Sequence, residues 1–403
     1  MSVPDLPNFR ARGPILQHVR KVLAFYDPAA FDPTGGFFHF LKDDGTVFNK
    51  QTRHLVSSAR HVFIWAMAAR HFPGTPSFER SLRHALQFLR EVHLNPKTGG
   101  YAWQLEWDGR QAKVVDSTNH CYGLAFVLLA HAHAALAGVE GTLGGMYETY
   151  QLMERHFWLP EYGLYADEAD ASWQLTGYRG QNANMHATEA CLAAFQASED
   201  PRFLERAILL ADNVVRRQSS LTDGLMIWEH YQADWSVDWE YNRHDSTNIF
   251  RPWGYQPGHF TEWAKLLLLI ERHQPLPWLL PRAEALFNRA TECAWDIQNG
   301  GLYYGFAPGF TICDDKKYHW VQAETLACAA LLGARTGKPQ YWDWYDRIWA
   351  YCWRHWVDHH HGAWFRILSR ENRGLTDEKS PAGKVDYHPM GACYDIAEVL
   401  KHS

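Results

Sequence analysis

The stretch GGYAWQ, residues 99–104, carries the pattern that decides the fold. Its two glycines make a turn, and the alternating aromatic and aliphatic residues after them indicate a short strand, half of a hairpin. Similar stretches recur at intervals of roughly 60 to 75 residues, which is typical of a repeat architecture. The other five copies are GGFFHF at 35–40, YGLYAD at 162–167, DGLMIW at 223–228, GGLYYG at 300–305 and HGAWFR at 361–366.

Two helical segments flank each copy, and they are recognised by apolar residues that recur every 3.6 positions. The predicted helices are 14–26, 54–72, 77–93, 117–137, 143–158, 183–198, 201–217, 257–273, 278–295, 318–336, 340–356 and 388–401. The second helix of each pair is the less polar one, as in HVFIWAMAARHF at 61–72. We therefore predict an all-α (α/α)6 barrel of twelve helices, with short β-hairpins in the long loops at one end. An open helical solenoid is the alternative, and the lack of an evident capping repeat favours the closed ring.

Composition excludes several classes of protein. The 403 residues carry a net charge of -6, so the chain has no basic surface and nucleic acid is not an expected partner. The start, MSVPDLPNFRARGP, lacks the apolar region of a secretory signal, and apolar runs such as LLLLI are too short to span a bilayer. We expect a cytoplasmic protein with no membrane partner. The seven cysteines form no C-x-x-C pair, so neither a disulfide framework nor a zinc ribbon is indicated.

Polar and aromatic residues stand at or near the start of every predicted inner helix. Because the inner helices of such a barrel begin at the same end, we expect these side chains to meet there, among the long loops that usually carry function. The candidate site residues are Arg60, Tyr122, Asn182, His186, His259, Glu262, Trp320, Glu324 and His388.

The histidines in this set suggest proton transfer. His259 and Glu262 are three residues apart and share a helical face, and His186 and Glu189 repeat the spacing. A neighbouring carboxylate fixes the tautomer of an imidazole and raises its basicity, whereas the positive end of a helix disfavours the imidazolium. Such histidines can remove the C2 proton of an open-chain aldose to give a cis-enediol. Returning the proton to C1 gives a ketose, and returning it to the opposite face of C2 gives an epimer.

A metal site is the competing interpretation. The H-E-x-x-H motif is absent, and di-iron bundles use Glu-x-x-His, the opposite order to the one seen here. The histidines of HWVDHHHGAW, residues 355–364, lie near the end of an outer helix, away from the expected site. The glycine-rich GVEGTLGG at 138–145 is followed by no Lys-Ser/Thr, so it is not a phosphate loop. We predict neither a metal nor an organic cofactor.

Five motifs, taken together, resemble the N-acylglucosamine 2-epimerase superfamily over nearly the whole chain. They are SSARHVF at 57–63, NANMHATEA at 182–190, PGHFTEWAKLLL at 257–268, KYHWVQAE at 317–324 and YHPMGACY at 387–394. The resemblance implies the (α/α)6 fold, a single catalytic domain covering residues 1–403, and activity without an organic cofactor.

The resemblance also implies roles for the candidate residues. His259 and His388 would form the acid and base pair, and His186 would assist ring opening or binding. The other six would hold the substrate, tune the histidines or line the sugar pocket: Arg60, Glu262, Asn182, Tyr122, Trp320 and Glu324.

The stretch RPWGYQPGHFTEWAKLLL, residues 251–268, looks most like the branch of aldose–ketose isomerases that act on D-mannose and on sulfoquinovose. We therefore expect an enzyme that interconverts D-mannose and D-fructose, and also D-lyxose and D-xylulose, working as a monomer or homodimer on a free monosaccharide. A sugar 2-epimerase is the nearest alternative, followed by a sulfo-sugar isomerase, a glycoside hydrolase and a non-catalytic sugar-binding protein. Val56 stands where some isomerase relatives carry tryptophan, which implies a different surface beneath the sugar.

Overall fold

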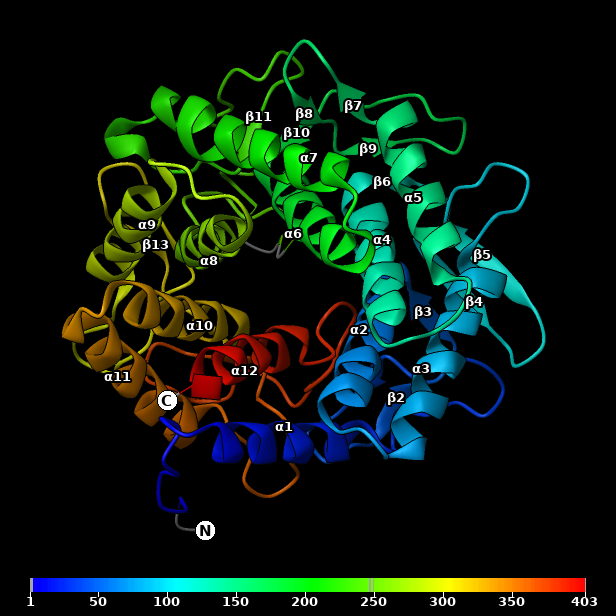
Figure 1. Cartoon of the computed structure of the whole chain (residues 1–403), viewed down its shortest axis with the longest axis horizontal. Helices are drawn as coiled ribbons and strands as arrows, with labels where there is room; N and C mark the ends of the chain where they lie inside the picture. The colour runs from blue at the N-terminus through cyan, green and yellow to red at the C-terminus, as the bar shows by residue number, and fades with distance from the viewer. Residues whose placement is uncertain (1–2, 246–247, 249, 403) are drawn as a thin grey trace.

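The computed structural model describes residues 3–245, 248 and 250–402. Its α-helices form two concentric rings, in which inner and outer helices alternate along the chain (Figure 1). The inner helices are α2 (Leu55–His71), α4 (Cys121–Leu136), α6 (Gln181–Ser198), α8 (Pro257–His273), α10 (His319–Thr336) and α12 (Tyr387–Val399). The outer helices are α1 (Arg12–Tyr26), α3 (Pro76–Phe88), α5 (Thr142–His156), α7 (Pro201–Asp212), α9 (Leu279–Ala294) and α11 (Pro339–His355).

The two rings differ in which faces they bury. An outer helix such as α3 buries Phe78, Leu82 and Leu86 on one side and exposes Glu79 and Arg83 on the other. An inner helix is enclosed on all sides, and α4 buries every residue except Tyr122, Ala135 and Leu136. A helix surrounded by protein is stable only if it is apolar all round, which explains why the second helix of each pair has the less polar sequence.

The inner ring is closed. Each inner helix packs against the next one along the chain, and α12 packs against both α2 and α1. The predicted (α/α)6 barrel is therefore confirmed, and the open solenoid is wrong.

Short antiparallel strands lie at the end of the ring where the inner helices begin, which we call the mouth. The first eight are β1 (Phe40–Leu41), β2 (Val47–Asn49), β3 (Thr52–His54), β4 (Gln104–Trp107), β5 (Ala112–Asp116), β6 (Asn119–His120), β7 (Trp158–Leu159) and β8 (Leu164–Tyr165). The others are β9 (Glu168–Ala169), β10 (Arg179–Gly180), β11 (His230–Tyr231), β12 (Gly305–Phe306), β13 (Ile312–Asp314), β14 (Lys317–Tyr318) and β15 (Ile367–Leu368).

Pairs of these strands connect each repeat to the next one. The pairs β3–β4, β6–β9, β10–β11 and β14–β15 make four of the connections, and the bridges Tyr255–Phe306 and Leu41–Ser380 make the other two. β3, β6, β10 and β14 each end at the residue before an inner helix begins. Hydrogen bonds between repeats thus fix the starting points of these inner helices relative to one another.

A glycine in the left-handed region of backbone conformation opens every copy of the repeated pattern. The six φ angles lie between +61° and +88°, a range that side-chain-bearing residues rarely adopt, at Gly36, Gly99, Gly163, Gly224, Gly300 and Gly362. In four copies the turn is closed by a bridge from an aromatic or aliphatic residue after the glycine: Phe31–Phe37, Leu94–Tyr101, Trp295–Leu302 and Val357–Trp364. These bridges explain why the pattern recurs in the sequence.

The helix ends agree with prediction to within two residues, with three exceptions. The helix predicted at 117–137 begins at Cys121, because Asp116 belongs to β5 and residues 119–120 form β6. The ends predicted at 93 and 217 lie in π-helical turns, η1 (Leu89–His93) and η2 (Asn213–Arg217). The 3₁₀ turns are η3 (Gln218–Leu221), η4 (Asp223–Leu225) and η5 (Leu400–His402). Of the helices described, none combines the length and apolarity needed to cross a membrane.

Candidate active site

The predicted site residues occupy two levels at the mouth. The first turns of inner helices carry Tyr122, Asn182, His259, Trp320 and His388. The second turns, five residues after each helix start, carry Arg60, His186, Glu262 and Glu324. An α-helix rises 1.5 Å per residue, so the second level lies about one turn deeper in the ring. It is also buried throughout, whereas Tyr122, Asn182 and Trp320 are partly exposed.

His388 is held between a carboxylate and a guanidinium. Its Nδ1 lies 2.7 Å from Glu324 Oε1, and its Nε2 lies 3.4 Å from a terminal nitrogen of Arg60. Because the carboxylate accepts, Nδ1 carries the proton and Nε2 is left with the lone pair of a neutral imidazole. Burial, together with the Arg60 charge, lowers the pKa of His388 well below its ordinary value, which keeps this imidazole neutral at pH 7.

His186 forms the carboxylate pair that its spacing predicts. Its Nδ1 lies 3.0 Å from Glu189 Oε2, and the other oxygen of Glu189 accepts a hydrogen bond from the Tyr387 hydroxyl. Burial lowers the pKa of His186, and the hydrogen bond with Glu189 opposes this effect. The rings of His186 and His388 are 6.5 Å apart, so two imidazoles from distant parts of the chain lie side by side.

The predicted pairing of His259 with Glu262 is wrong. The Nδ1 of His259 lies 2.9 Å from Glu229 Oε1, and Gln181 donates to the other oxygen of Glu229 at 2.9 Å. Trp263 in turn donates to Gln181 Oε1 at 2.6 Å. His259 lies in the first turn of α8, level with the loop that carries Glu229, whereas Glu262 is a full turn deeper. Residues three apart share a helical face, but a carboxylate at the same level makes the shorter contact.

Aromatic rings surround these polar groups. The Trp320 ring is 5.0 Å from His259 and 5.7 Å from His388, so it contacts both histidines of the predicted acid and base pair. The Arg60 guanidinium lies 4.5 Å from each of the Phe126 and Tyr387 rings. These contacts, with the ion pairs, bring His186, His259, His388 and their neighbours into one group, which we call the histidine cluster.

Arg60 is fixed by more than its stacking. It donates to the carbonyl oxygen of Gly383, and a terminal nitrogen lies 3.4 Å from the Tyr122 hydroxyl. Asn182 makes no side-chain hydrogen bond within the described part of the chain, and its buried Oδ1 has no partner there. That oxygen is therefore free to accept from a ligand hydroxyl. Val56, the departure noted in the sequence, is fully buried in the core at the start of α2.

Three carboxyl groups and a lysine lie beneath His259 and His388, and we call them the carboxylate layer: Glu189, Glu262, Glu324 and Lys265. The Lys265 ammonium is 2.6 Å from Glu324 Oε2. Glu262 is 1% exposed, and its buried Oε2 has no hydrogen-bond partner among the described residues. Burial, followed by the charge of Glu324, raises the pKa of Glu262 well above its ordinary value. The protonated form of Glu262 is thus favoured, and in that form it can donate a hydrogen bond.

Two groups in this region have ligand-type atoms close enough to hold a metal ion. The atoms of His186, Glu189 and Glu262 lie within 4.8 Å of one another, as do those of Glu262, Glu324 and His388. Both groups are already compensated by protein donors, because Tyr387 donates to Glu189 and Lys265 pairs with Glu324. We therefore interpret these residues as proton-transfer groups and not as metal ligands.

Comparison with known proteins places the chain in a family. The sequence model of N-acylglucosamine 2-epimerase (GlcNAc 2-epimerase) matches residues 36–392. The chain belongs to the N-acylglucosamine 2-epimerase family. Within it, the chain is 47% identical over 395 residues to a D-mannose isomerase of Marinomonas mediterranea, covering 98% of this chain and 99% of the relative. A D-mannose isomerase of Thermobifida fusca is 35% identical over 350 residues, covering 86% and 84%.

A solved structure is similar throughout its length. The crystal structure of a D-mannose isomerase superposes with a TM-score of 0.95 at 46% sequence identity, covering 98% of this chain and 100% of that one. The fold of this chain, with its ring of inner helices, is therefore also the fold of a solved structure from the same family.

In this member of the N-acylglucosamine 2-epimerase family, the sequence prediction missed four polar or charged residues that contact the histidines or their carboxylates: Gln181, Glu229, Lys265 and Tyr387. Two of them had a recognisable signal. Glu229 directly follows DGLMIW, as Glu168 follows YGLYAD, whereas the other four copies of the repeated pattern are followed by an apolar residue. Lys265 is the one charged residue between Glu262 and Glu271 in a buried apolar helix. Gln181 and Tyr387, each the first residue of an inner helix, had none.

Proposed function

We propose that this protein is a D-mannose isomerase, an aldose–ketose isomerase that interconverts D-mannose and D-fructose. The observation that carries the proposal is the histidine cluster, in which three imidazoles each place Nδ1 on a carboxylate and one of them, His388, lies beside Arg60. The D-mannose isomerase relatives supply the choice of sugar.

The chemistry requires a base, an acid and a stabilised enediol. In an open-chain aldose the C1 carbonyl makes the C2 proton removable. One unprotonated Nε2 takes that proton, the electron pair forms the C1–C2 double bond, and O1 gains a proton to give the cis-enediol. The imidazolium then returns its proton to C1 as O2 loses its own and becomes the ketone of D-fructose. We assign the acid and base roles to His259 and His388, and assistance in ring opening to His186.

The remaining candidates hold the sugar and stabilise charge. Arg60 is directed at Nε2 of His388, where it can also donate to O1 or O2 as negative charge develops there. Protonated Glu262 and the free oxygen of Asn182 offer one donor and one acceptor to hydroxyl groups. Tyr122 and Trp320, both partly exposed, offer aromatic surface to the sugar ring, and Glu324 orients His388.

Residues 1–403 act in this proposal as a single catalytic domain. The chemistry needs no electron transfer and no group transfer, and we propose that it proceeds without an organic cofactor. D-Lyxose has the same configuration as D-mannose at C2, C3 and C4, so we propose that it is converted to D-xylulose at the same site.

Proton NMR of D-mannose with the protein in D2O tests the proposed function. We expect D-fructose to appear, with limited exchange of solvent deuterium if one imidazole carries the proton from C2 to C1. D-Glucose in place of fructose would identify a 2-epimerase. Cleavage of a glycoside, with every free aldose unchanged, would identify a glycoside hydrolase.

Prolonged treatment with EDTA tests whether the reaction needs a metal. We expect the initial rate of fructose formation to stay within about twofold of the untreated protein, because proton transfer by imidazole needs no Lewis acid. A loss of activity that Mn²⁺ or Zn²⁺ restores would instead show that the reaction needs a metal. Metal binding would then be assigned to the two groups described above, which combine His186 or His388 with carboxylates of the carboxylate layer.

A further inference from the structure

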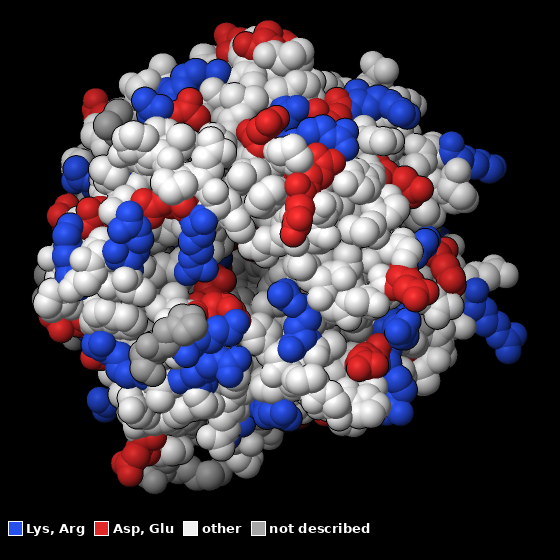
Figure 2. Space-filling view, viewed as in Figure 1, with Lys and Arg blue, Asp and Glu red and all other residues white. Residues whose placement is uncertain are grey.

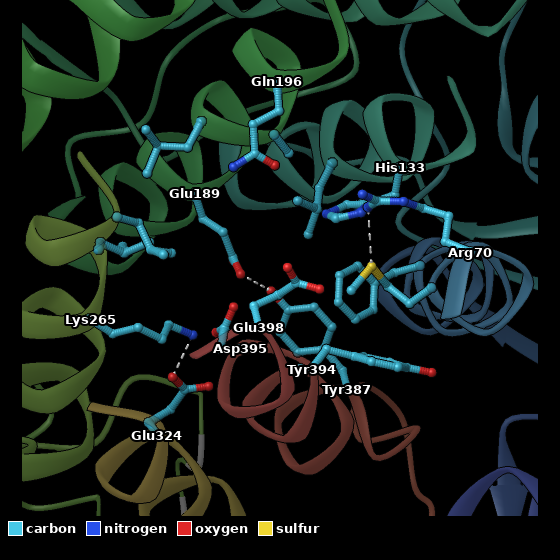
Figure 3. Close-up of a pocket in the computed structure, with 18 of the residues that line it drawn as sticks. Arg70, His133, Glu189, Gln196, Lys265, Glu324, Tyr387, Tyr394, Asp395 and Glu398 are labelled. Carbon is cyan, nitrogen blue, oxygen red and sulfur yellow. Dashed lines mark hydrogen bonds and ion pairs between the residues drawn. The ribbon is translucent and has the colours of Figure 1, made fainter. Parts of the chain in front are cut away.

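Lys265 is an unusual residue for its position. It lies in the third turn of α8, within the stretch WAKLLLLI, and its side chain is buried with only 4% of the residue exposed. A buried lysine is unfavourable unless a carboxylate compensates its charge. Glu324 does so, with its Oε2 at 2.6 Å from the ammonium (Figure 3).

The same Glu324 carboxylate reaches the histidine cluster with its other oxygen. Oε1 is 2.7 Å from Nδ1 of His388, so one carboxylate bridges the lysine and the imidazole. Glu189, on the neighbouring helix α6, likewise holds Nδ1 of His186 at 3.0 Å. In Figure 3 the Glu189 and Lys265 side chains extend from adjacent helices toward the centre of the ring, where Glu324 meets the lysine. Lys265 thus stands close to two of the three carboxylates that orient histidines.

Glu189 and Glu324 would not stay ionised without a nearby cation. Oxygens of Glu189 and Glu324 both lie within 4.8 Å of Glu262; Glu262 and Glu324 are buried, and Glu189 is partly exposed. Carboxylates brought together away from water take up protons unless positive charge is nearby. Arg60 lies on the histidine side of the layer, where it contacts Gly383 and His388. Lys265 supplies the positive charge on the other side.

We propose that Lys265 is a positioning residue for the histidines: its ammonium keeps Glu189 and Glu324 ionised, so that both accept from Nδ1 and leave Nε2 of His186 and His388 unprotonated toward the sugar. The inference rests on the proposed isomerase function and deepens it. Lys265 does not itself touch the reacting atoms.

The charges around Lys265 determine the direction of its effect. It faces Glu189 from α6, Glu324 from α10, Asp395 from α12, and Glu262 from its own helix. Its charge also opposes an imidazolium at His388, as do those of Arg60 and of protonated His186. Without the ammonium, the Glu324–His388 pair has an uncompensated negative charge and binds a proton more tightly. As the pH falls, His388 of the variant therefore becomes protonated, and stops acting as a base, at a higher pH than in the wild type.

A cavity of about 240 Å³ gives access to Lys265 from the side opposite the mouth. Glu189, Lys265 and Glu324 form part of its lining, and the exposed side chains of Arg70 and Arg272, near the ends of α2 and α8, also line it. Figure 2 shows the hollow at the centre of this face, with basic and acidic side chains around it. A small cation can therefore reach the position of the Lys265 ammonium without crossing the sugar site.

The pH dependence of kcat for D-mannose tests the proposal. We expect Lys265→Met to move the acidic limb upward by about one pH unit, and therefore to lower kcat at pH 7 by no more than about threefold, with little change in KM. Lys379→Met is the matched control, because Lys379 is also buried and pairs with Asp358, which holds none of the three histidines of the cluster. It should lower stability and leave the acidic limb in place. An unmoved limb in Lys265→Met would overturn the proposal.

Chemical rescue distinguishes the loss of the lysine charge from a disturbance of packing. Lys265→Ala removes the equivalent of one n-propylammonium ion from a site that the cavity reaches. We expect added n-propylammonium to restore kcat and to move the acidic limb back, and propan-1-ol, of similar size but neutral, to do neither. Equal rescue by the two compounds would show a packing role and contradict the inference.

A measurement without substrate separates this inference from the proposed function. Histidine ¹⁵N NMR of the wild type at pH 7.5 should show His186 and His388 protonated at Nδ1 alone. In Lys265→Met we expect their protonated forms to persist to higher pH. A wild type that leaves D-mannose unchanged would remove the proposed function, whereas identical histidine titrations in the two proteins would remove the role of Lys265.

Discussion

His388→Asn is expected to lower kcat for the conversion of D-mannose by about 10²- to 10⁴-fold, the usual effect of losing a general acid or base. An asparagine amide can still donate to Glu324 Oε1, which lies 2.7 Å from the imidazole nitrogen that it replaces. It cannot accept a proton from carbon. The substitution therefore removes proton transfer and preserves the orientation of Glu324, so KM should change far less than kcat.

The expected pH profile follows from the environment of His388. Its pKa is lowered by burial and by Arg60, so the acidic limb of kcat in the wild type should lie below pH 6.5. His18→Asn is the matched control: His18 is also a buried histidine, on α1, and it accepts a hydrogen bond from Trp364 at 2.9 Å. This control should reduce the stability of the protein and keep kcat within about twofold. Full activity of His388→Asn would exclude His388 as acid or base.

Arg60→Met is expected to lower kcat by about 10²- to 10³-fold, because it removes the cation beside the oxygens that gain charge in the enediol. It should also raise the pKa of His388, because the guanidinium opposes the imidazolium. The acidic limb of kcat should therefore move to higher pH. A methionine of similar length retains contact with the Phe126 and Tyr387 rings, so the loss is one of charge and donors rather than of volume.

Arg206→Met provides the comparison for Arg60. The Arg206 guanidinium lies 3.3 Å from the Trp158 ring and pairs with Glu154 at 2.5 Å, but it belongs to the outer helix α7. Its loss should destabilise the protein without changing the pH profile of kcat. If Arg60→Met changed only KM and left both kcat and the acidic limb unaltered, Arg60 would be a binding group with no part in charge stabilisation.

Most of the fold could be predicted from the sequence because its determinants are local. A left-handed glycine followed by alternating apolar residues can be recognised in six copies, and apolar periodicity marks the helices between them. The start of α4 was misplaced because Asp116 and Ser117 look like a helix cap, whereas Asp116 pairs with Gln104 across two strands. No sequence pattern near Asp116 indicates its pairing with Gln104.

Most individual residues of the candidate site could be predicted from the sequence, but the carboxylate partners of two of the three histidines could not. The barrel topology brings the helix starts together, so His186 and His388 could be expected to lie near one another. The identity of each carboxylate partner depends on depth within the ring and on loops. Glu324 reaches His388 from a neighbouring helix, and Glu229 reaches His259 from a loop, where a spacing of three residues indicated Glu262. Only the His186–Glu189 pair, which lies within one helix, followed from spacing alone.

The circle of strand connections at the mouth has an evolutionary consequence. Four inner helices begin where a strand shared with a neighbouring repeat ends, while the hairpin tips beyond, such as residues 42–46 and 108–111, make few bonds to the interior. Insertions or exchanges at the hairpin tips can therefore change which side chains reach the mouth, while the spacing of the imidazoles stays the same. A scaffold built in this way can acquire new sugar preferences by recombining surface segments, with its proton-handling machinery inherited unchanged.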